Sequence, residues 1–507
     1  MNSKLQELQE LKVLKARLRE VIDLNSALSI LHWDQSTYMP DGGAQARGRT
    51  TATIGRIAQE KQVDPEIGRL LDVLEPVAED LPYDDDDASL IRVARRDFEK
   101  AIKVPPDFTA EFYNHRAVSF STWAKARPEN DFKAVESMLE KTLDFSRRYA
   151  DFFPGYDHPA DPLIDRADYS MKAETIRALF ADLREQLVPL VDAISQQPIA
   201  DDSCLAQHYP KKLQLKFGEW VARQLGYDFK RGRQDLTHHP FMTGFSIDDV
   251  RITTRVNEHY LNDALFGTMH ESGHAMYGQG VDDKFEASPL MYGTSSGVHE
   301  SQSRLWENLV GRGMPFWRRF YPQLQAMFPG QLGDVPIETF YRAINKVERS
   351  LIRVEADEVT YNLHVMIRFD LELALLEGNL SIHDLPDAWH ARYESDLGLR
   401  APDNRDGVMQ DVHWYDGMIG GSFQGYTLGN IMSALFFDAA KKAHPEIMGE
   451  IEVGEFGTLL TWLTENIYRH GRKYTADDLV RRITGSPLKI EPYIAYLQTK
   501  FGELYQL

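Results

Sequence analysis

Hydrophobic residues recur every three to four positions through most of this 507-residue chain, the spacing that lines them along one face of an α-helix. Proline, glycine or aspartate typically closes each segment that has this spacing. The segments that we expect to be helical are residues 5–31, 88–102, 131–153, 172–194, 205–225, 336–376, 431–443, 454–469 and 476–483. The pattern therefore predicts a mainly α-helical protein.

Alternation of apolar and polar residues, which is typical of a half-buried strand, is rare in this chain. The best candidate is residues 250–256, where Arg251 and Arg255 alternate with Ile252 and Val256 around two threonines. This segment lies just before the helical stretch that carries the chain's most informative motif. We therefore expect a small β-sheet that borders the functional site.

The chain's length alone would suggest roughly three domains. However, no linker rich in proline, glycine or serine separates parts of different composition, and the helical pattern continues from the first residues to the last. We also find no internal repeat and no coiled-coil heptads. Residues 1–507 are therefore expected to form a single unit.

Composition narrows the expected partners and compartment. A formal net charge of −20 argues against nucleic acid, because phosphate binding needs a basic surface. The single cysteine, Cys204, rules out an intrachain disulfide and favours a reducing compartment. Residues Met1 to Leu8 begin an amphipathic helix rather than a signal peptide, and no apolar run is long enough to span a bilayer. We expect a soluble, unsecreted protein with no membrane partner.

The densest acidic run extends from Asp84 to Asp87. No histidine accompanies it, so we interpret it as a solvated loop or a helix start rather than as a metal site.

The chemistry of the chain is indicated by a His-Glu-x-x-His run, which extends from His270 to His274. Residues four apart lie on one face of a helix, so both imidazoles can bind a common metal ion. Glu271 is rotated away by about a hundred degrees at 3.6 residues per turn, which places its carboxylate where a general base is needed. The apolar residues on both sides of the run indicate a buried helix.

A catalytic metal site usually takes three protein ligands and leaves one position open. Residues 292–297 form a predicted loop, and Glu300 opens a second amphipathic stretch that would return against the first helix. Glu300 could therefore complete the site, with His299 and Glu307 as the competing candidates. A surface position is the alternative for Glu300, because an unpaired glutamate is seldom buried.

Several short motifs together resemble one known family, in the order in which that family has them. The motifs are Leu31-His32-Trp33-Asp34-Gln35, His239-Pro240-Phe241, Asp249-Val250-Arg251-Ile252-Thr253, the run from His270 to His274, His299-Glu300-Ser301-Gln302, Ile352-Arg353-Val354-Glu355-Ala356-Asp357, and Gly425-Tyr426-Thr427-Leu428-Gly429. The sequence resembles the carboxypeptidase Taq family of metallocarboxypeptidases over essentially its whole length.

The resemblance implies a cytosolic enzyme that removes single amino acids, with broad specificity, from peptides with a free C-terminus. It also implies a zincin-like helical ellipsoid, whose two lobes border a deep groove with the metal at its floor, and commonly a homodimer. His270, His274 and Glu300 would hold one Zn²⁺ or Co²⁺ ion per chain. The donor set accepts either metal.

Such an enzyme must also bind the terminal carboxylate of its substrate, a task that suits the planar fork of arginine. The candidates are Arg353 and Arg251. Arg353 stands four residues before Asp357 on a predicted helix, so a surface ion pair is the alternative. Asp357 could instead orient a metal-bound histidine.

The developing oxyanion needs a hydrogen-bond donor, for which Tyr426 and His239 are the candidates. Tyr426 lies between two glycines that permit close approach of a ligand, although a lone tyrosine is more often part of a core. The pair His413-Trp414 could line the same cleft.

The predicted mechanism is attack on the last peptide bond by a water molecule that the metal and Glu271 activate together. Endopeptidase and dipeptidyl carboxypeptidase activities remain alternatives with the same metal chemistry. A helical scaffold with a structural metal is the alternative from a different class, although structural zinc usually has four protein ligands.

Overall fold

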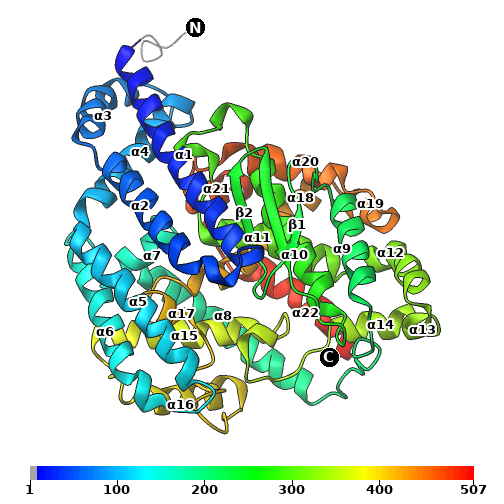
Figure 1. The fold of residues 1–507 in the computed structure, drawn as a ribbon. Helices are drawn as coiled ribbons and strands as arrows, with labels where there is room; N and C mark the ends of the chain where they lie inside the picture. Colours follow the sequence, from blue (N-terminus) through cyan, green and yellow to red (C-terminus); the bar gives the residue numbers. More distant parts are fainter. Residues whose placement is uncertain (1–7) are drawn as a thin grey trace.

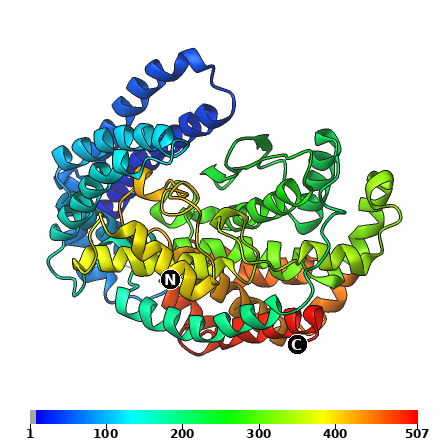
Figure 2. The same cartoon turned by 90° about the horizontal axis from the view of Figure 1, so that it is seen from below.

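Long helices account for most of residues 8–507, the part of the chain that the computed structural model describes (Figure 1). The predicted mainly helical class is confirmed. Figures 1 and 2 place the N-terminal helices on one side of the molecule, and the sheet with the helices that follow it on the other. None of the helices within residues 8–507 is both long and apolar enough to cross a membrane.

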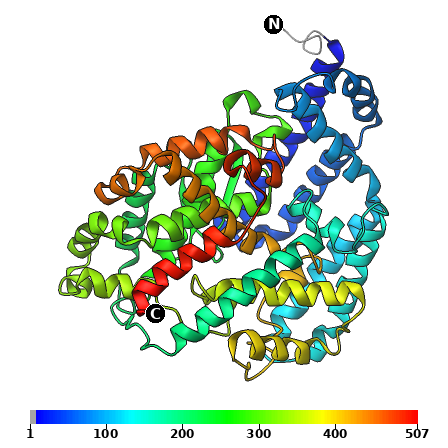
Figure 3. The same ribbon diagram turned by 180° about the vertical axis from the view of Figure 1, so that it is seen from behind.

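The N-terminal helices build a small core of their own at one end of the molecule (Figure 3). The helices at this end are α1 (Gln9–Thr37), α2 (Ala44–Gln62), α3 (Pro65–Ala78) and α4 (Asp86–Lys103), of which α1, α3 and α4 supply residues to the core. Leu14, Leu74 and Ile91 lie at the centre of this core, and Phe285 and Leu290 join it from a segment much later in the chain. The predicted helix start at residue 5 lies outside the described residues.

The acidic run before α4 is a helix start, as predicted. The side chain of Asp85 accepts hydrogen bonds from the backbone N–H groups of Asp87 and Ala88, which caps the helix. Asp86 pairs with Lys284, and Asp87 pairs with Lys15.

The next helices belong to the main core, which extends from α5 to the C-terminal helix. They are α5 (Pro106–Ala126), α6 (Phe132–Asp151), α7 (Asp161–Ala167), α8 (Ala173–Ser195) and α9 (Lys211–Leu225). The helix predicted over 205–225 begins later than expected, because its first residues form a loop that ends at Pro210. Proline has no N–H group to donate, so it suits the residue just before a helix.

The predicted strand before the metal-binding motif is confirmed as the central strand of a mixed sheet. The strands β1 (Gln234–Leu236), β2 (Met242–Ser246) and β3 (Asp249–Thr254) are arranged in the order β1-β3-β2. β3 is parallel to β1 and antiparallel to β2, with Thr243 opposite Arg251. One face of the sheet packs on α10 (Asn262–Gln279), so the sheet supports the helix that carries the His-Glu-x-x-His run.

The second predicted helix of the site is α11 (Ser296–Arg304), which continues as a π-helical segment, η4 (Leu305–Gly311). α11 packs between α10 and α18 (Gln424–Ala443). Both contacts depend on glycine. A Cβ atom at Gly273 of α10 would lie 2.7 Å from the carbonyl oxygen of Gln302, and one at Gly429 of α18 would lie 2.5 Å from Cγ of Glu300.

The remaining helices complete the main core. They are α12 (Met314–Met327), α13 (Pro329–Leu332), α14 (Ile337–Ile344), α15 (Tyr361–Glu377), α16 (Leu385–Leu397), α17 (His413–Asp416), α19 (Ile447–Val453), α20 (Gly457–Asn466), α21 (Ala476–Thr484) and α22 (Glu491–Tyr505). Of the helices predicted here, 431–443 and 476–483 are confirmed, and 454–469 is shorter than expected.

The prediction of one continuous helix over 336–376 was wrong. α14 ends at Ile344, and α15 begins only at Tyr361, with a short 3₁₀ turn (Arg353–Glu355) between them. The side chain of Gln410 accepts a hydrogen bond from the backbone N–H of Arg353 and donates one to the carbonyl of Leu351. Backbone groups in this loop therefore find their partners on a distant segment, which a local spacing pattern does not reveal.

Replacement of Gly273 by alanine should destabilise the fold, because the new methyl group meets backbone atoms of α11 that cannot move aside. We expect a loss of about 1–3 kcal/mol, the usual cost of overpacking a core. The measurement is urea unfolding followed by circular dichroism, with a chelator present so that metal binding does not contribute.

Gly267→Ala is the matched control on the same helix, because a Cβ atom there meets only Oγ1 of Thr254, at 3.9 Å. This variant should keep or slightly raise the stability, since alanine favours helix by up to about 1 kcal/mol over glycine. Equal unfolding midpoints for the two variants would contradict the role given to Gly273.

Candidate metal centre

His270 and His274 lie one helical turn apart on the face of α10 that meets α11. Their ring centroids are 4.9 Å apart, and the rings are nearly perpendicular. The Nε2 atoms of both rings approach the same carboxylate oxygen of α11. The helix therefore presents the two imidazoles as the motif predicted.

Glu300 supplies that oxygen. Its Oε2 atom lies 3.6 Å from Nε2 of His270 and 3.4 Å from Nε2 of His274. Two ligands about 2.1 Å from a tetrahedral ion are separated by about 3.4 Å. One donor atom from each of the three residues lies within 4.8 Å of the others. The donor set and its spacing therefore fit a divalent metal ion.

Neighbouring cations keep the buried Glu300 ionised. Nε of Arg304, one turn further along α11, donates to Oε1 at 2.7 Å. Burial opposes ionisation of Glu300, but Arg304 and the two histidines hold its pKa well below the ordinary value. Oε1 is thus occupied by the arginine, and Oε2 faces the histidines.

Glu307, one of the competing ligand candidates, lies behind His270 instead of beside Glu300. Its Oε2 atom is 2.9 Å from Nδ1 of His270 and also accepts from Arg304, while its Oε1 atom accepts from Arg312. Burial opposes ionisation of Glu307, but His270 and the two arginines lower its pKa to about 2. An ionised acceptor at Nδ1 leaves Nε2 of His270 with a free lone pair.

The contacts of Asp357 do not match the role predicted for it. Its carboxylate accepts from the backbone of Glu348, Val359 and Thr360 and from the Thr360 hydroxyl, and it therefore organises the loop before α15. Among the described residues, the carboxylate that contacts a histidine of the motif from behind belongs to Glu307. The prediction that Asp357 orients a metal-bound histidine was wrong.

His299, the other competing candidate, contacts His274. The two Nδ1 atoms are 2.6 Å apart. Burial and the neighbouring His274 lower the pKa of His299 to about 3, so its ring is neutral at physiological pH. A neutral His299 can accept the Nδ1 proton of His274, which again leaves Nε2 of His274 facing Glu300.

Glu271 is buried, with 6% of its surface exposed. Burial raises its pKa, against the opposing influence of His270 and His274 and with the support of the carboxylates of Glu300 and Glu307. A raised pKa makes this carboxylate a stronger base than an exposed glutamate, which suits a general base.

The two arginines predicted to bind a carboxylate already hold one each. Arg353 is buried and donates through Nε and Nη2 to Asp411, and through Nη1 to the hydroxyl of Tyr361. The alternative interpretation of Arg353, a surface ion pair with Asp357, was wrong. The sequence patterns singled out neither Gln410 nor Asp411, although both lie within three residues of His413.

Arg251 lies on β3, where Nε and Nη2 donate to Asp249, both at 2.8 Å. Its guanidinium lies over the rings of Trp33 and Phe245, at 4.4 and 4.8 Å from the ring centroids. Arg251 therefore joins the sheet to α1.

Tyr426 lies on α18, one turn before the glycine that contacts Glu300. The guanidinium carbon of Arg353 is 5.4 Å from its ring centroid, and its hydroxyl is 3.3 Å from Nε2 of His413. His239 is exposed in the loop between β1 and β2. The structure therefore groups Tyr426, His413 and Arg353 together near Glu300, and leaves His239 at the surface.

A cavity of about 650 Å³ adjoins the metal centre. Arg304, Glu307 and Tyr361 line it on one side, and Pro240, next to His239, also borders it. Its wall combines charged, polar and apolar residues. His270, Glu271, His274 and Glu300 are not among its lining residues, so the cavity meets the candidate centre through Arg304 and Glu307, which contact Glu300 and His270.

Comparison with known proteins agrees with this geometry. Residues 13–501 match the family model described as carboxypeptidase Taq (M32) metallopeptidase. Thermostable carboxypeptidase 1 of Thermus thermophilus is 40% identical, with 96% of this chain and 97% of the relative covered. Carboxypeptidase 1 of Bacillus subtilis is 34% identical, with 97% of each chain covered.

The fold is also that of solved carboxypeptidases. The crystal structure of the M32 carboxypeptidase from Deinococcus radiodurans superimposes with a TM-score of 0.96 at 48% identity, covering 99% of this chain and 100% of that chain. The matches span the whole arrangement of helices and sheet that holds His270, His274 and Glu300. The chain therefore belongs to the carboxypeptidase Taq (M32) family of metallopeptidases.

Proposed function

We propose that this metallocarboxypeptidase releases single amino acids from the free C-terminus of peptides and accepts a broad range of side chains. The observation that carries the proposal is the convergence of two imidazoles and one carboxylate beside a second, buried carboxylate, Glu271. The mixed chemistry of the adjoining cavity wall supports a broad range of substrates.

His270, His274 and Glu300 would hold one divalent ion through two nitrogens and one oxygen, a donor set that suits zinc and cobalt alike. When bound, such an ion polarises a carbonyl group and lowers the pKa of water. Glu307 and His299 fix the two imidazoles from behind, so that both Nε2 atoms face the ion.

Glu271 acts as the general base in this proposal. It takes a proton from the attacking water and returns it to the amine that leaves. The burial that raises its pKa favours the return step, because a weakly basic carboxylate would hold the proton too loosely.

Arg353 is the better candidate for the substrate carboxylate. Asp411 occupies the edge formed by Nε and Nη2, and the hydroxyl of Tyr361 takes one N–H of Nη1. One N–H therefore remains on each terminal nitrogen for a second, end-on carboxylate. Arg353 also lies beside Tyr426, which packs near Glu300, whereas Arg251 is held between rings of α1 and β2.

Tyr426 is the proposed donor to the oxyanion, since it lies one helical turn before Gly429, the residue of α18 that contacts Glu300. His413 holds the hydroxyl from behind. His239 remains a second candidate donor, because its loop borders the cavity through Pro240. A cytosolic location and a homodimer remain predictions from the family resemblance.

The proposed reaction is tested by mass spectrometry of one peptide and its C-terminal amide after incubation with metal-loaded protein. We expect a ladder of products, each one residue shorter, from the free acid and almost none from the amide. Cleavage of both peptides at the same internal bonds would indicate an endopeptidase, and loss of two residues at a time a dipeptidyl carboxypeptidase.

Glu271→Gln is the matched variant for this test, because it keeps the shape of the side chain and removes the base. It should bind the metal in the same amount and lose about two to four orders of magnitude in kcat. Activity within about tenfold of the unmodified protein would rule out Glu271 as the general base.

The role of Glu307 predicts a selective loss of metal affinity. Glu307→Gln should weaken metal binding by about 10–100-fold, measured by competition with a chromophoric chelator, because it removes the charged acceptor behind His270. Asp357→Asn is the control, since Asp357 binds only its own loop. Equal metal affinities for both variants, with circular dichroism unchanged, would disprove this distinction.

The proposed anchor predicts a change in KM more than in kcat. Arg353→Lys keeps the charge but loses the fork, so KM for a free-acid peptide should rise by about tenfold or more. Arg251→Lys is the comparison variant and should leave KM nearly unchanged. The opposite ranking of the two variants would transfer the anchoring role to Arg251.

A further inference from the structure

A second large cavity shares no lining residue with the cavity beside the metal centre. Its volume is about 610 Å³. Helices α3 and α4 form one wall, and Phe153, Tyr156 and Tyr169 form the other. The first wall belongs to the small N-terminal core and the second packs with the main core, so the cavity lies at the junction of the two cores. We call it the basic cavity.

Cationic side chains of α4 line the basic cavity along one helical face. They are Arg92, Arg95, Arg96, Lys100 and Lys103. Their spacings of three, four, seven and eight residues are those of a single helix face. The acidic residues that also line the cavity are Glu75, Glu79 and Glu99. The lining therefore carries an excess of positive charge in a chain whose formal net charge is −20.

Two of these cations have carboxylate partners of their own. Arg95 pairs with Asp72 and Glu75, and Lys100 pairs with Asp165. Their charges are therefore balanced within the protein.

The positive charges of the other three side chains are incompletely balanced by carboxylates. Arg96 shares Asp97 with Arg472, and its Nη2 atom is buried without a hydrogen-bond partner. Arg92 donates only to uncharged oxygens, those of Tyr83, Ser89 and Lys473. Lys103 forms no ion pair among residues 8–507. A buried guanidinium with a free donor is costly unless an acceptor arrives.

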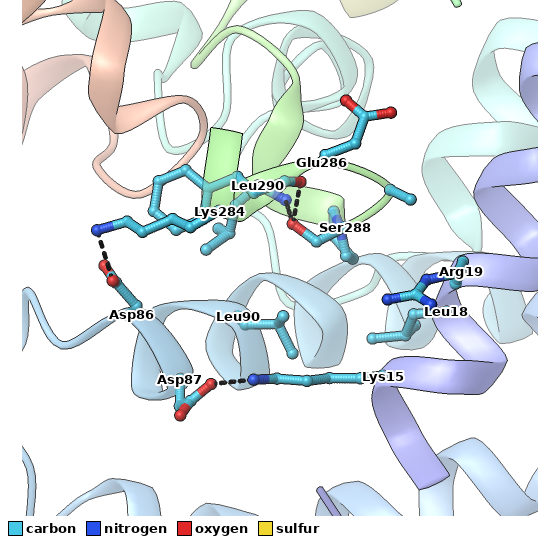
Figure 4. A pocket seen from close by; sticks show the side chains of 13 residues that line it. Lys15, Leu18, Arg19, Asp86, Asp87, Leu90, Lys284, Glu286, Ser288 and Leu290 are labelled. Atoms are coloured by element: carbon cyan, nitrogen blue, oxygen red, sulfur yellow. Dashed lines mark hydrogen bonds and ion pairs between the residues drawn. The ribbon is translucent and has the colours of Figure 1, made fainter. Parts of the chain in front are cut away.

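A neighbouring cavity is also lined by cationic side chains. It lies where α1 and α4 meet the segment 284–290 (Figure 4). Both of its lysines, Lys15 and Lys284, reach a carboxylate across the cavity, Asp87 and Asp86 respectively. Arg19 also lines this cavity and forms no ion pair among residues 8–507. Incompletely compensated cations therefore line both cavities, so charge alone does not distinguish the basic cavity.

Aromatic rings give the basic cavity flat apolar surfaces as well. The guanidinium carbon of Arg92 lies 3.9 Å from the ring centroid of Tyr83, and that of Arg96 lies 4.2 Å from that of Tyr169. Tyr83 and Tyr156 keep 49% and 37% of their surface exposed. Flat rings beside guanidinium groups suit a ligand that has both a planar ring and an anionic group.

We propose that the basic cavity binds a phosphate monoester that carries a planar ring, the chemical class to which nucleotides belong. The phosphate would accept from Arg96 and Arg92 near the middle of the cavity, with Lys103 at the rim adding long-range attraction. The ring would pack on the exposed tyrosines. Because this ligand contacts both walls, its binding stabilises the junction of the two cores.

The test uses the metal-loaded protein and adenosine monophosphate as the probe, with adenosine as the uncharged comparison. Isothermal titration calorimetry should show saturable binding of the monophosphate and at least about tenfold weaker binding of adenosine, because charge-assisted hydrogen bonds are lost. The melting temperature should rise with the concentration of the monophosphate and not with that of adenosine.

Two variants assign the binding to this cavity. Arg96→Gln should weaken binding of the monophosphate by about tenfold. Lys103→Gln, at an exposed side chain that forms no ion pair or hydrogen bond within residues 8–507, should weaken it by about threefold. Lys442→Gln, on the surface of α18 and paired with Asp438, is the control and should change nothing. Absence of saturable binding overturns the proposal. So does equal affinity in Lys103→Gln and Lys442→Gln, which would place the probe elsewhere, for example on the bound metal.

Discussion

The site depends above all on the close approach of three helices. Glu300 reaches the two histidines because the backbone of α11 lies against α10 at Gly273. The side chain of Glu300 packs at the same time against α18 at Gly429. Gly273 and Gly429 make both approaches possible, since any larger residue would collide with α11. Local sequence therefore fixes the ligands of α10, while tertiary packing fixes the third ligand.

Placing several ionisable groups in a buried space requires their charges to balance. Glu300 and Glu307 are both ionised, and Arg304 contacts both of them, with Arg312 on the far side of Glu307. Removal of one partner from such a network costs far more than the net value of the pair, because it leaves an uncompensated charge. This balance sets Glu271 apart, since its carboxylate is buried without an arginine of its own and is therefore the most readily protonated of the three.

Much of the fold and the centre of the site could be predicted, because they rest on short-range patterns. The spacing of His270 and His274 and the loop before Glu300 follow from helix geometry and capping. By contrast, the loop that carries Arg353 has no proline or glycine to mark it, and its backbone is held by Gln410, far along the chain. The role predicted for Asp357 failed for a different reason, because the acceptor behind His270 is Glu307, whose position depends on the packing of η4.

The segment between α10 and α11 has a consequence for the behaviour of the whole molecule. It leaves the metal helix, inserts Phe285 and Leu290 among the N-terminal helices, and returns to begin α11. The segment that joins the histidines to Glu300 is thus anchored in a hydrophobic cluster to which none of these three residues belongs. We therefore expect order in that cluster and binding of an ion to be coupled, so that amide exchange in α3 and α4 would respond to an event at a remote location.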